Sequence, residues 1–125
     1  MVVLDTCALI EAFKGNPSFS IKAIQQIELD ACILSLSFAE IACKVKLGKL
    51  EMDIKPRKLL DIISQTKNIE IVNIDVEHWL DSIDLEWLEN KDPVDRVITA
   101  FAAKRDLPIV TTDIRIRDFY GNVIW

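Results

Sequence analysis

The 125-residue sequence predicts an α/β domain with a central parallel sheet of about five strands. Short apolar runs alternate with stretches whose apolar residues recur every three or four positions, which is the pattern of alternating strands and helices. The first runs are continuously apolar, as expected of strands buried on both faces. The length and the 50% share of hydrophobic residues fit one domain over residues 1–125.

The strands and helices follow one another in regular order. Ile21–Leu29 has helical spacing after Pro17 and Ser20, which are favourable helix-start residues. Ser37–Leu47 is the next predicted helix, and Gly48 ends it. Five apolar segments are predicted as strands: Val2–Leu4, Cys32–Leu36, Ile69–Ile74, Ile109–Thr111 and Val123–Trp125.

Two further helices begin at aspartates. Asp75 is a predicted N-cap of a surface helix whose apolar stripe extends to Trp87, with most acids on the opposite face. Asp92 is the predicted N-cap of the next helix, because Pro93 then occupies the first helical position. Asp95 lies in the first turn of that helix, where the helix dipole favours an acid.

The charge and composition exclude several classes of protein. No apolar run is long enough for a membrane helix and no signal peptide is recognisable, so we expect a cytoplasmic protein. The net charge is −5, but six bases against two acids in Lys44–Lys58 give a local +4, whereas Asp75–Asp92 carries −6. The basic segment is either a nucleic-acid contact or a solvated helix face.

Cysteine and histidine are too scarce for several common active sites. Cys7, Cys32 and Cys43 are widely spaced among apolar neighbours, which indicates reduced thiols in or near the core. His78 is the single histidine, so a Ser-His-Asp triad, a Cys-His pair or a multi-histidine zinc site has no support.

Four acids stand where predicted strands give way to helices or loops: Asp5, Glu40, Asp95 and Asp113. Parallel α/β sheets bind ligands at the carboxyl ends of their strands, so these acids meet if the first and fourth strands are central neighbours. Local explanations also exist. The helix dipole favours an acid in a first turn, Ser37 and Glu40 have capping-box spacing, and Asp113 can cap a short turn.

A cluster of carboxylates needs a cation. Two full charges 4 Å apart repel by about 4 kcal/mol at an effective dielectric near 20. Oxygen ligands without imidazole or thiolate favour Mg²⁺ or Mn²⁺ over zinc or copper. Water bound to such an ion has a lowered pKa and can attack phosphorus, so the four acids predict metal-dependent chemistry on a phosphate.

Five segments resemble PIN-domain proteins of the VapC toxin type: Leu4-Asp5-Thr6, Ser37–Ala42, Leu47–Leu50, Asp92–Ala100 and Val110–Asp113. The resemblance implies a three-layer α/β/α fold and Mg²⁺- or Mn²⁺-dependent endoribonuclease activity. It also implies a homodimer and a small antitoxin partner encoded beside it. Asn90-Lys91 and Val94 depart from the family pattern, which commonly has histidine before the acidic segment and Phe at position 94.

The resemblance also implies roles for individual residues. Asp5, Glu40, Asp95 and Asp113 match the family's acidic quartet, with Asp5 and Asp95 the strongest predicted metal ligands. The supporting residues are Thr6 and Thr112, which match its hydroxyl positions, and Asp92, which matches the first acid of its Asp-Pro-x-Asp-Arg segment. The RNA backbone is expected at Lys44–Lys58 or at Arg115 and Arg117. For Arg96 we expect a salt bridge with a neighbouring acid, or else a phosphate contact.

Two other hypotheses remain open. Receiver domains and haloacid-dehalogenase-like phosphatases also carry aspartates after parallel strands and use Mg²⁺. Cys7 stands where the phosphatase needs a second Asp, and Thr112-Asp113 stands where a receiver needs Lys. The third hypothesis is a PIN-like scaffold that binds a partner without catalysis, its acids serving only as helix caps.

Overall fold

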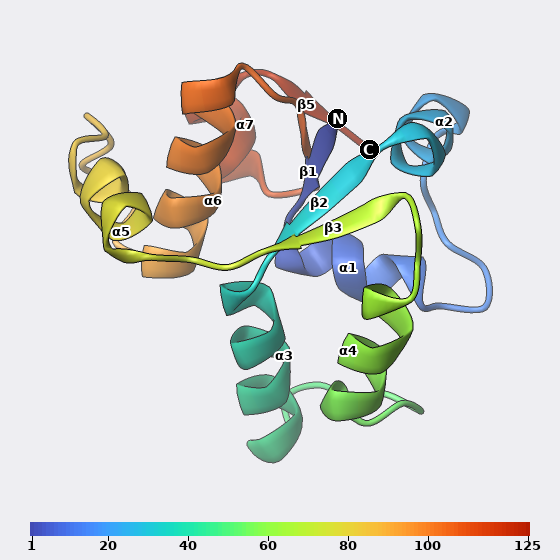
Figure 1. Cartoon of the computed structure of the whole chain (residues 1–125). Coiled ribbons are helices and arrows are strands. Elements are labelled where there is room, and N and C mark those ends of the chain that lie inside the picture. The colour runs from blue at the N-terminus through green and yellow to red at the C-terminus, as the bar shows by residue number, and fades with distance from the viewer.

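The computed structural model describes residues 1–125 as a five-stranded sheet surrounded by seven helices (Figure 1). The strand order is β3-β2-β1-β4-β5, and every neighbouring pair is parallel. The strands are β1 (Val2–Leu4), β2 (Ala31–Leu34), β3 (Ile69–Val72), β4 (Ile109–Val110) and β5 (Val123–Ile124). The helices are α1 (Thr6–Ala12), α2 (Ile21–Leu29), α3 (Leu36–Lys46), α4 (Pro56–Ser64), α5 (Val76–Ile83), α6 (Pro93–Arg105) and α7 (Ile114–Tyr120).

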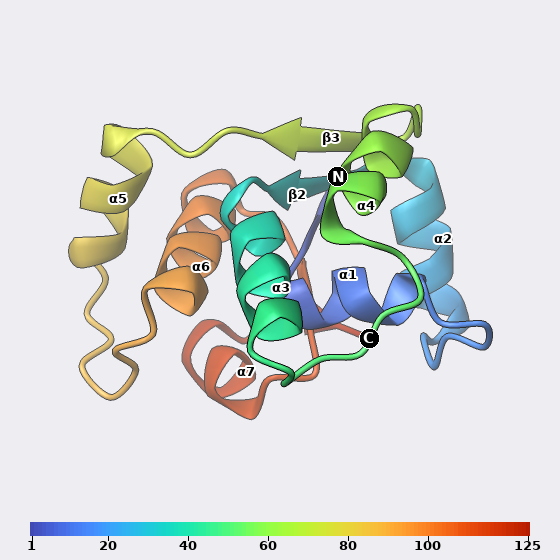
Figure 2. The same ribbon diagram turned by 90° about the horizontal axis from the view of Figure 1, so that it is seen from below.

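The sheet separates two hydrophobic cores, which confirms the predicted α/β fold with three layers. Val2 and Leu4 pack with α1, α3 and α4 on one face, whereas Val3 packs with α6 and α7 on the other. Figures 1 and 2 show the two groups of helices on opposite sides of the strands. Alternate residues of one short strand therefore serve both cores, which explains the continuous apolar runs.

The predicted surface helix at Asp75 is shorter than the sequence indicated. Asp75 does cap α5, and His78 completes a capping box with it. The helix ends at Ile83, however, and Trp87 lies beyond it, buried and stacked on Phe119 at 4.7 Å. The apolar stripe of α5 is largely exposed instead of buried.

The structure also corrects smaller predictions about α3 and the cysteines. The second strand ends at Leu34, so α3 begins at Leu36, one residue earlier than predicted. Of the cysteines, Cys32 is buried and Cys7 is partly buried, but Cys43 is exposed on α3, so its assignment to the core is wrong. None of the helices combines the length and the apolar character needed to cross a bilayer.

Candidate metal centre

The predicted acids line one cavity at the carboxyl edge of the sheet. β1 and β4 are central neighbours, so the residues that follow them, Asp5 and Asp113, emerge side by side. Asp95 reaches the cavity from the first turn of α6, and Glu40 reaches it from α3. The cavity has a volume of about 250 Å³, and the other residues that line it are Thr6, Cys7, Ile10, Lys44, Asp92, Thr112 and Arg115.

Asp5 is the most buried of these acids and is held at both oxygens. Its Oδ1 accepts a hydrogen bond from the Ala8 amide at 2.9 Å, so Asp5 is the N-cap of α1. Its Oδ2 accepts a hydrogen bond from the Thr111 hydroxyl at the end of β4. Burial raises the pKa of Asp5 above its usual value, although these hydrogen bonds oppose the shift.

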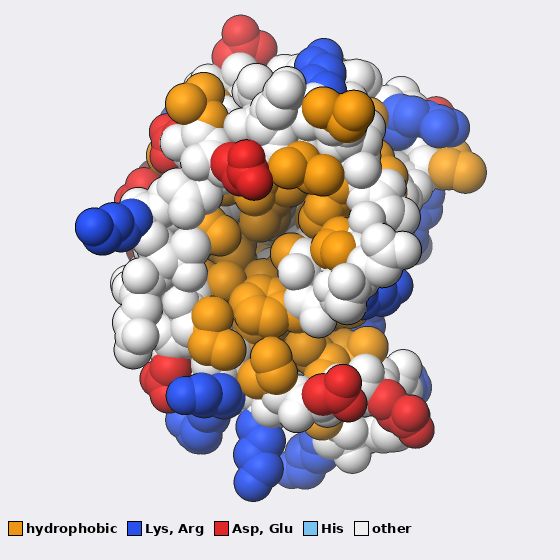
Figure 3. Space-filling view, turned by 90° about the vertical axis from the view of Figure 1, so that its right-hand side faces the viewer, with side chains coloured by type: hydrophobic (Ala, Val, Ile, Leu, Met, Phe, Trp, Pro, Cys, Tyr) orange, Lys and Arg blue, Asp and Glu red, His pale blue; other side chains and the backbone are white.

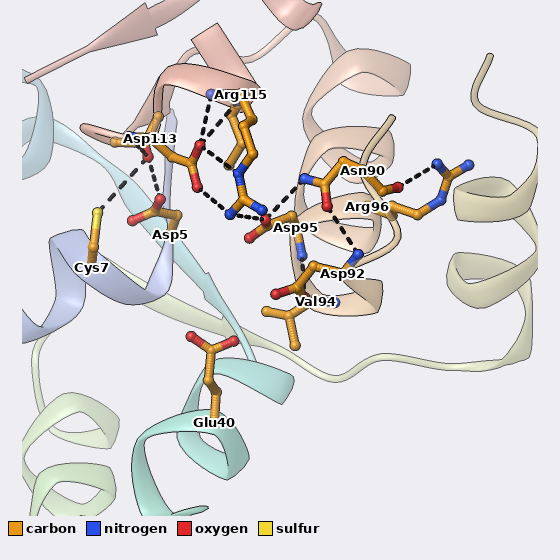
Figure 4. A network of polar contacts seen from close by, with 12 residues as sticks. Asp5, Cys7, Glu40, Asn90, Asp92, Val94, Asp95, Arg96, Asp113 and Arg115 are labelled. Atoms are coloured by element: carbon orange, nitrogen blue, oxygen red, sulfur yellow. Dashed lines mark hydrogen bonds and ion pairs between the residues drawn. The ribbon is translucent and has the colours of Figure 1, made fainter. Parts of the chain in front are cut away.

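Asp95 and Asp113 share one cation. The Nη2 atom of Arg115 lies 3.1 Å from Asp95 Oδ2 and 2.9 Å from Asp113 Oδ2 (Figure 4). Burial raises the pKa of Asp95 to about 6, despite a hydrogen bond from the Asn90 amide at 3.0 Å. Burial also acts to raise the pKa of Asp113, but hydrogen bonds and charge from Arg115 outweigh it and leave that pKa lowered.

Asp113 and Asp92 are N-caps, as the sequence predicted. Asp113 Oδ1 accepts from the amides of Arg115 and Ile116 at the start of α7. Asp92 Oδ1 accepts from the amides of Val94 and Asp95 at the start of α6. In both cases the capping bonds fix the carboxylate against its own helix.

Glu40 lies on the opposite wall of the cavity and has no capping role. Ser35 is the N-cap of α3, and its side chain makes no capping bond, so the predicted capping box between Ser37 and Glu40 is wrong. The Ser37 hydroxyl instead accepts a hydrogen bond from Thr6 at 3.0 Å. Figure 4 shows Glu40 directed from α3 towards Asp5, and its carboxylate pairs with Lys44 at 3.1 Å.

The hydroxyl support differs from the one predicted. Thr6 bonds Ser37, and Thr112 lies 3.6 Å from the sulfur of Cys7, so neither bonds a carboxylate. The hydroxyl that does so is Thr111, which sequence reasoning missed although it directly precedes Thr112. The backbone amide of Thr111 donates to the carbonyl oxygen of Ile124 in β5, and its side chain lies towards Asp5.

Arg96 holds the backbone, and its predicted salt bridge is wrong. Its guanidinium donates to the carbonyl oxygens of Ser82, Leu85, Trp87 and Asn90, four points on the segment between α5 and α6. Arg96 thus satisfies the Ser82 carbonyl at the C-terminal end of α5 and three carbonyls of the non-helical segment that follows it. The same segment carries the Asn90 side chain that orients Asp95.

The donor set fits Mg²⁺ or Mn²⁺ held partly through water. No three His, Cys, Asp or Glu side chains are arranged to hold one ion directly. Asp95 Oδ2 and Asp113 Oδ2 are at most about 6 Å apart, since both lie near the same nitrogen, so both carboxylates would be within reach of one hydrated ion. Mg²⁺ usually keeps several waters beside one or two carboxylates, so oxygen ligands around a small cavity suit it.

Several solved structures have the same fold as this chain. Among solved structures, a toxin-antitoxin complex from Klebsiella pneumoniae is 19% identical, with coverage of 100% of this chain and 97% of that chain and a TM-score of 0.67. FitAcB from Neisseria gonorrhoeae is 18% identical, with coverage of 100% and 97% and a TM-score of 0.67. A structure of FitAB bound to an IR36 DNA fragment is 17% identical, with coverage of 100% and 94% and a TM-score of 0.65.

At these identities the three structures establish a shared fold. A comparison with curated protein sequences found no match. A family model described as PIN domain matches residues 2–122, nearly the whole length of this sequence. The chain therefore belongs to the PIN domain family.

Proposed function

We propose that this protein is a metal-dependent endoribonuclease and the cytoplasmic toxin of a toxin-antitoxin pair. The observation that carries the proposal is the cavity in which Asp5, Glu40, Asp95 and Asp113 meet. PIN domains are generally nucleases, and one of the structures with the same fold is a toxin-antitoxin complex by name. A receiver or phosphatase function has no comparable support.

The proposed roles follow from how each acid is held. Asp5 and Asp95 would bind Mg²⁺ or Mn²⁺, and Asp113 and Glu40 would hold its water shell. When bound, the ion supplies a water of lowered pKa and positive charge beside the phosphate. The hydroxyl of Thr111 orients Asp5, and the amide of Asn90 orients Asp95. Asp92 shapes the site by starting α6.

The RNA backbone requires cations near the acids. Lys44 lines the same cavity, and the other bases of Lys44–Lys58 continue from α3 towards α4, so they extend a positive surface away from the site. Arg115 projects into the cavity. Arg117 lines a different cavity beside Trp125 and pairs with Asp118. Of the two arginines, we therefore assign the phosphate contact to Arg115.

Two apolar surfaces suit the proposed protein partners. Figure 3 shows hydrophobic side chains gathered in a hollow on the side of α2 and α4. A cavity on this side of the sheet has an apolar floor and a charged rim, and we propose it for an amphipathic segment of the antitoxin. Its apolar residues are Ile10, Phe13, Val45, Leu50, Met52 and Ile54, and its charged residues are Lys14, Glu51 and Asp53. The exposed stripe of α5, formed by Val76, Trp79, Leu80 and Ile83, is the surface we propose for a homodimer contact.

The proposal is tested by RNA cleavage with purified protein. Cleavage is expected with Mn²⁺, and EDTA should stop it. Asp5→Asn should abolish cleavage and relieve any growth arrest caused by expression, because asparagine still caps α1 but lacks the charge that binds the ion. Asp118→Asn on the exposed face of α7 is the matched control and should cleave as wild type does.

Metal titration separates the nuclease from a scaffold whose acids serve only as helix caps. Calorimetry should detect Mn²⁺ binding to the wild type and to Asp118→Asn but not to Asp5→Asn. Binding that is absent from the wild type, or that survives in Asp5→Asn, would favour the scaffold. Cleavage that persists in Asp5→Asn would show that the proposed site is wrong.

A further inference from the structure

Arg115 contacts the two carboxylates that face each other across the cavity. It is the only basic residue that pairs with Asp95 or with Asp113, and one nitrogen atom, Nη2, serves both. Its Nε also donates to Asp113 Oδ1 at 3.3 Å. The guanidinium thus lies between α6 and α7, at the oxygens that point into the cavity (Figure 4).

The carboxylates are half-buried and held by other hydrogen bonds, whereas the arginine side chain is mostly exposed. The side chains of Asp95 and Asp113 are only 16% and 23% exposed, and that of Arg115 is 59% exposed. Asp95 is held by the Asn90 amide, and Asp113 is held by the first amides of α7. A long exposed side chain with rotatable bonds can therefore leave this position without disturbing the helices.

A divalent ion and the guanidinium need the same oxygen atoms. If Asp95 binds the ion and Asp113 holds its water shell, both need the Oδ2 atoms that Arg115 Nη2 contacts, so the guanidinium would have to leave, since its charge would otherwise repel the ion. An arginine released next to a nuclease site finds an equivalent partner in a phosphodiester, since guanidinium binds carboxylate and phosphate with the same forked geometry.

We propose that Arg115 exchanges between these carboxylates and the phosphate of the substrate, so that metal and RNA bind cooperatively. The inference rests on the proposed nuclease function. Without substrate, Arg115 competes with the ion and weakens its binding. A bound phosphodiester draws the guanidinium away and frees the carboxylates, and by reciprocity a bound ion frees the guanidinium for the phosphodiester.

Calorimetric titration with Mn²⁺ tests the competition. Arg115→Gln should bind Mn²⁺ about fivefold more tightly than the wild type, as expected when a partly exposed ion pair no longer has to be broken. Arg117→Gln on the same helix is the matched control and should bind as the wild type does, because Arg117 pairs only with Asp118. Circular dichroism checks that each variant keeps its fold.

A second titration with dimethyl phosphate as the probe tests the exchange. This uncleaved phosphodiester should tighten Mn²⁺ binding to the wild type and leave that of Arg115→Gln unchanged. Equal or weaker Mn²⁺ binding by Arg115→Gln would overturn the inference, because it would make Arg115 a simple support of the carboxylates. If the wild type binds no Mn²⁺ through Asp5, the nuclease proposal fails first. If it does and Arg115→Gln behaves identically, only the exchange fails.

Discussion

Arg96 is expected to be the most stability-sensitive residue outside the two cores. Arg96→Met keeps the aliphatic part of the side chain but removes the donors to four carbonyl oxygens. Those of Ser82, Leu85 and Asn90 lie 2.9, 3.0 and 3.1 Å from the guanidinium nitrogens, and that of Trp87 is the fourth. The substitution should therefore release the segment that joins α5 to α6.

The expected loss of stability follows from these bonds. A hydrogen bond to a charged group contributes about 1.5–3 kcal/mol, but bonds of one group are not additive, and part of this segment is exposed to water that can replace the donor. We expect Arg96→Met to lower the free energy of unfolding by about 3–4 kcal/mol. Arg96→Lys should cost about 2 kcal/mol, since an ammonium cannot span all four carbonyls.

Urea denaturation followed by tryptophan fluorescence measures this loss, because Trp87 lies on the released segment. Arg105→Met on the same helix is the matched control, since Arg105 makes one backbone hydrogen bond, to Phe101. It should cost less than about 1 kcal/mol. A similarly small loss for Arg96→Met would refute the assignment of Arg96 as the residue that holds the segment.

Three further predictions concern the site and the surface. Thr111→Val should raise the pKa of Asp5 further and weaken Mn²⁺ binding, whereas Thr112→Val should not, as calorimetry of both variants can measure. Because the pKa of Asp95 is about 6 and the ion binds the ionised acid, Mn²⁺ binding should weaken about tenfold from pH 7 to pH 5; unchanged affinity would contradict this. Leu80→Asp on α5 should convert a dimer into a monomer in light scattering.

The fold was predictable because its signals are local or depend on burial. Val2–Leu4 is apolar at every position, which indicates a strand covered on both faces, and the structure confirms this through the two cores. Asp75 and Asp92 stand at the start of apolar stripes with helical spacing, and both cap the predicted helices.

The errors arose where tertiary contacts decide the outcome. The apolar periodicity predicted that α5 extends to Trp87. Nothing in the local pattern reveals that Arg96 donates to the carbonyl oxygens of Ser82 and Leu85. Backbone carbonyls carry no residue-specific signal, so their partner is invisible in a sequence. By sequence, either Ser35 or Ser37 could be the N-cap of α3. The structure has Ser35 there, and the Ser37 hydroxyl instead accepts a hydrogen bond from Thr6, which is distant in the sequence.

Helix capping and the proposed metal binding are compatible uses of the same carboxylates. In both Asp5 and Asp113, Oδ1 accepts a hydrogen bond from an amide at the start of a helix. The other oxygen, Oδ2, accepts from the Thr111 hydroxyl in Asp5 and from the Arg115 guanidinium in Asp113. The cap therefore fixes the direction of the second oxygen before any ion is bound. An acid that follows a strand and caps the next helix is held at one oxygen and offers the other, which is the pre-organisation that the proposed, partly hydrated ion would require.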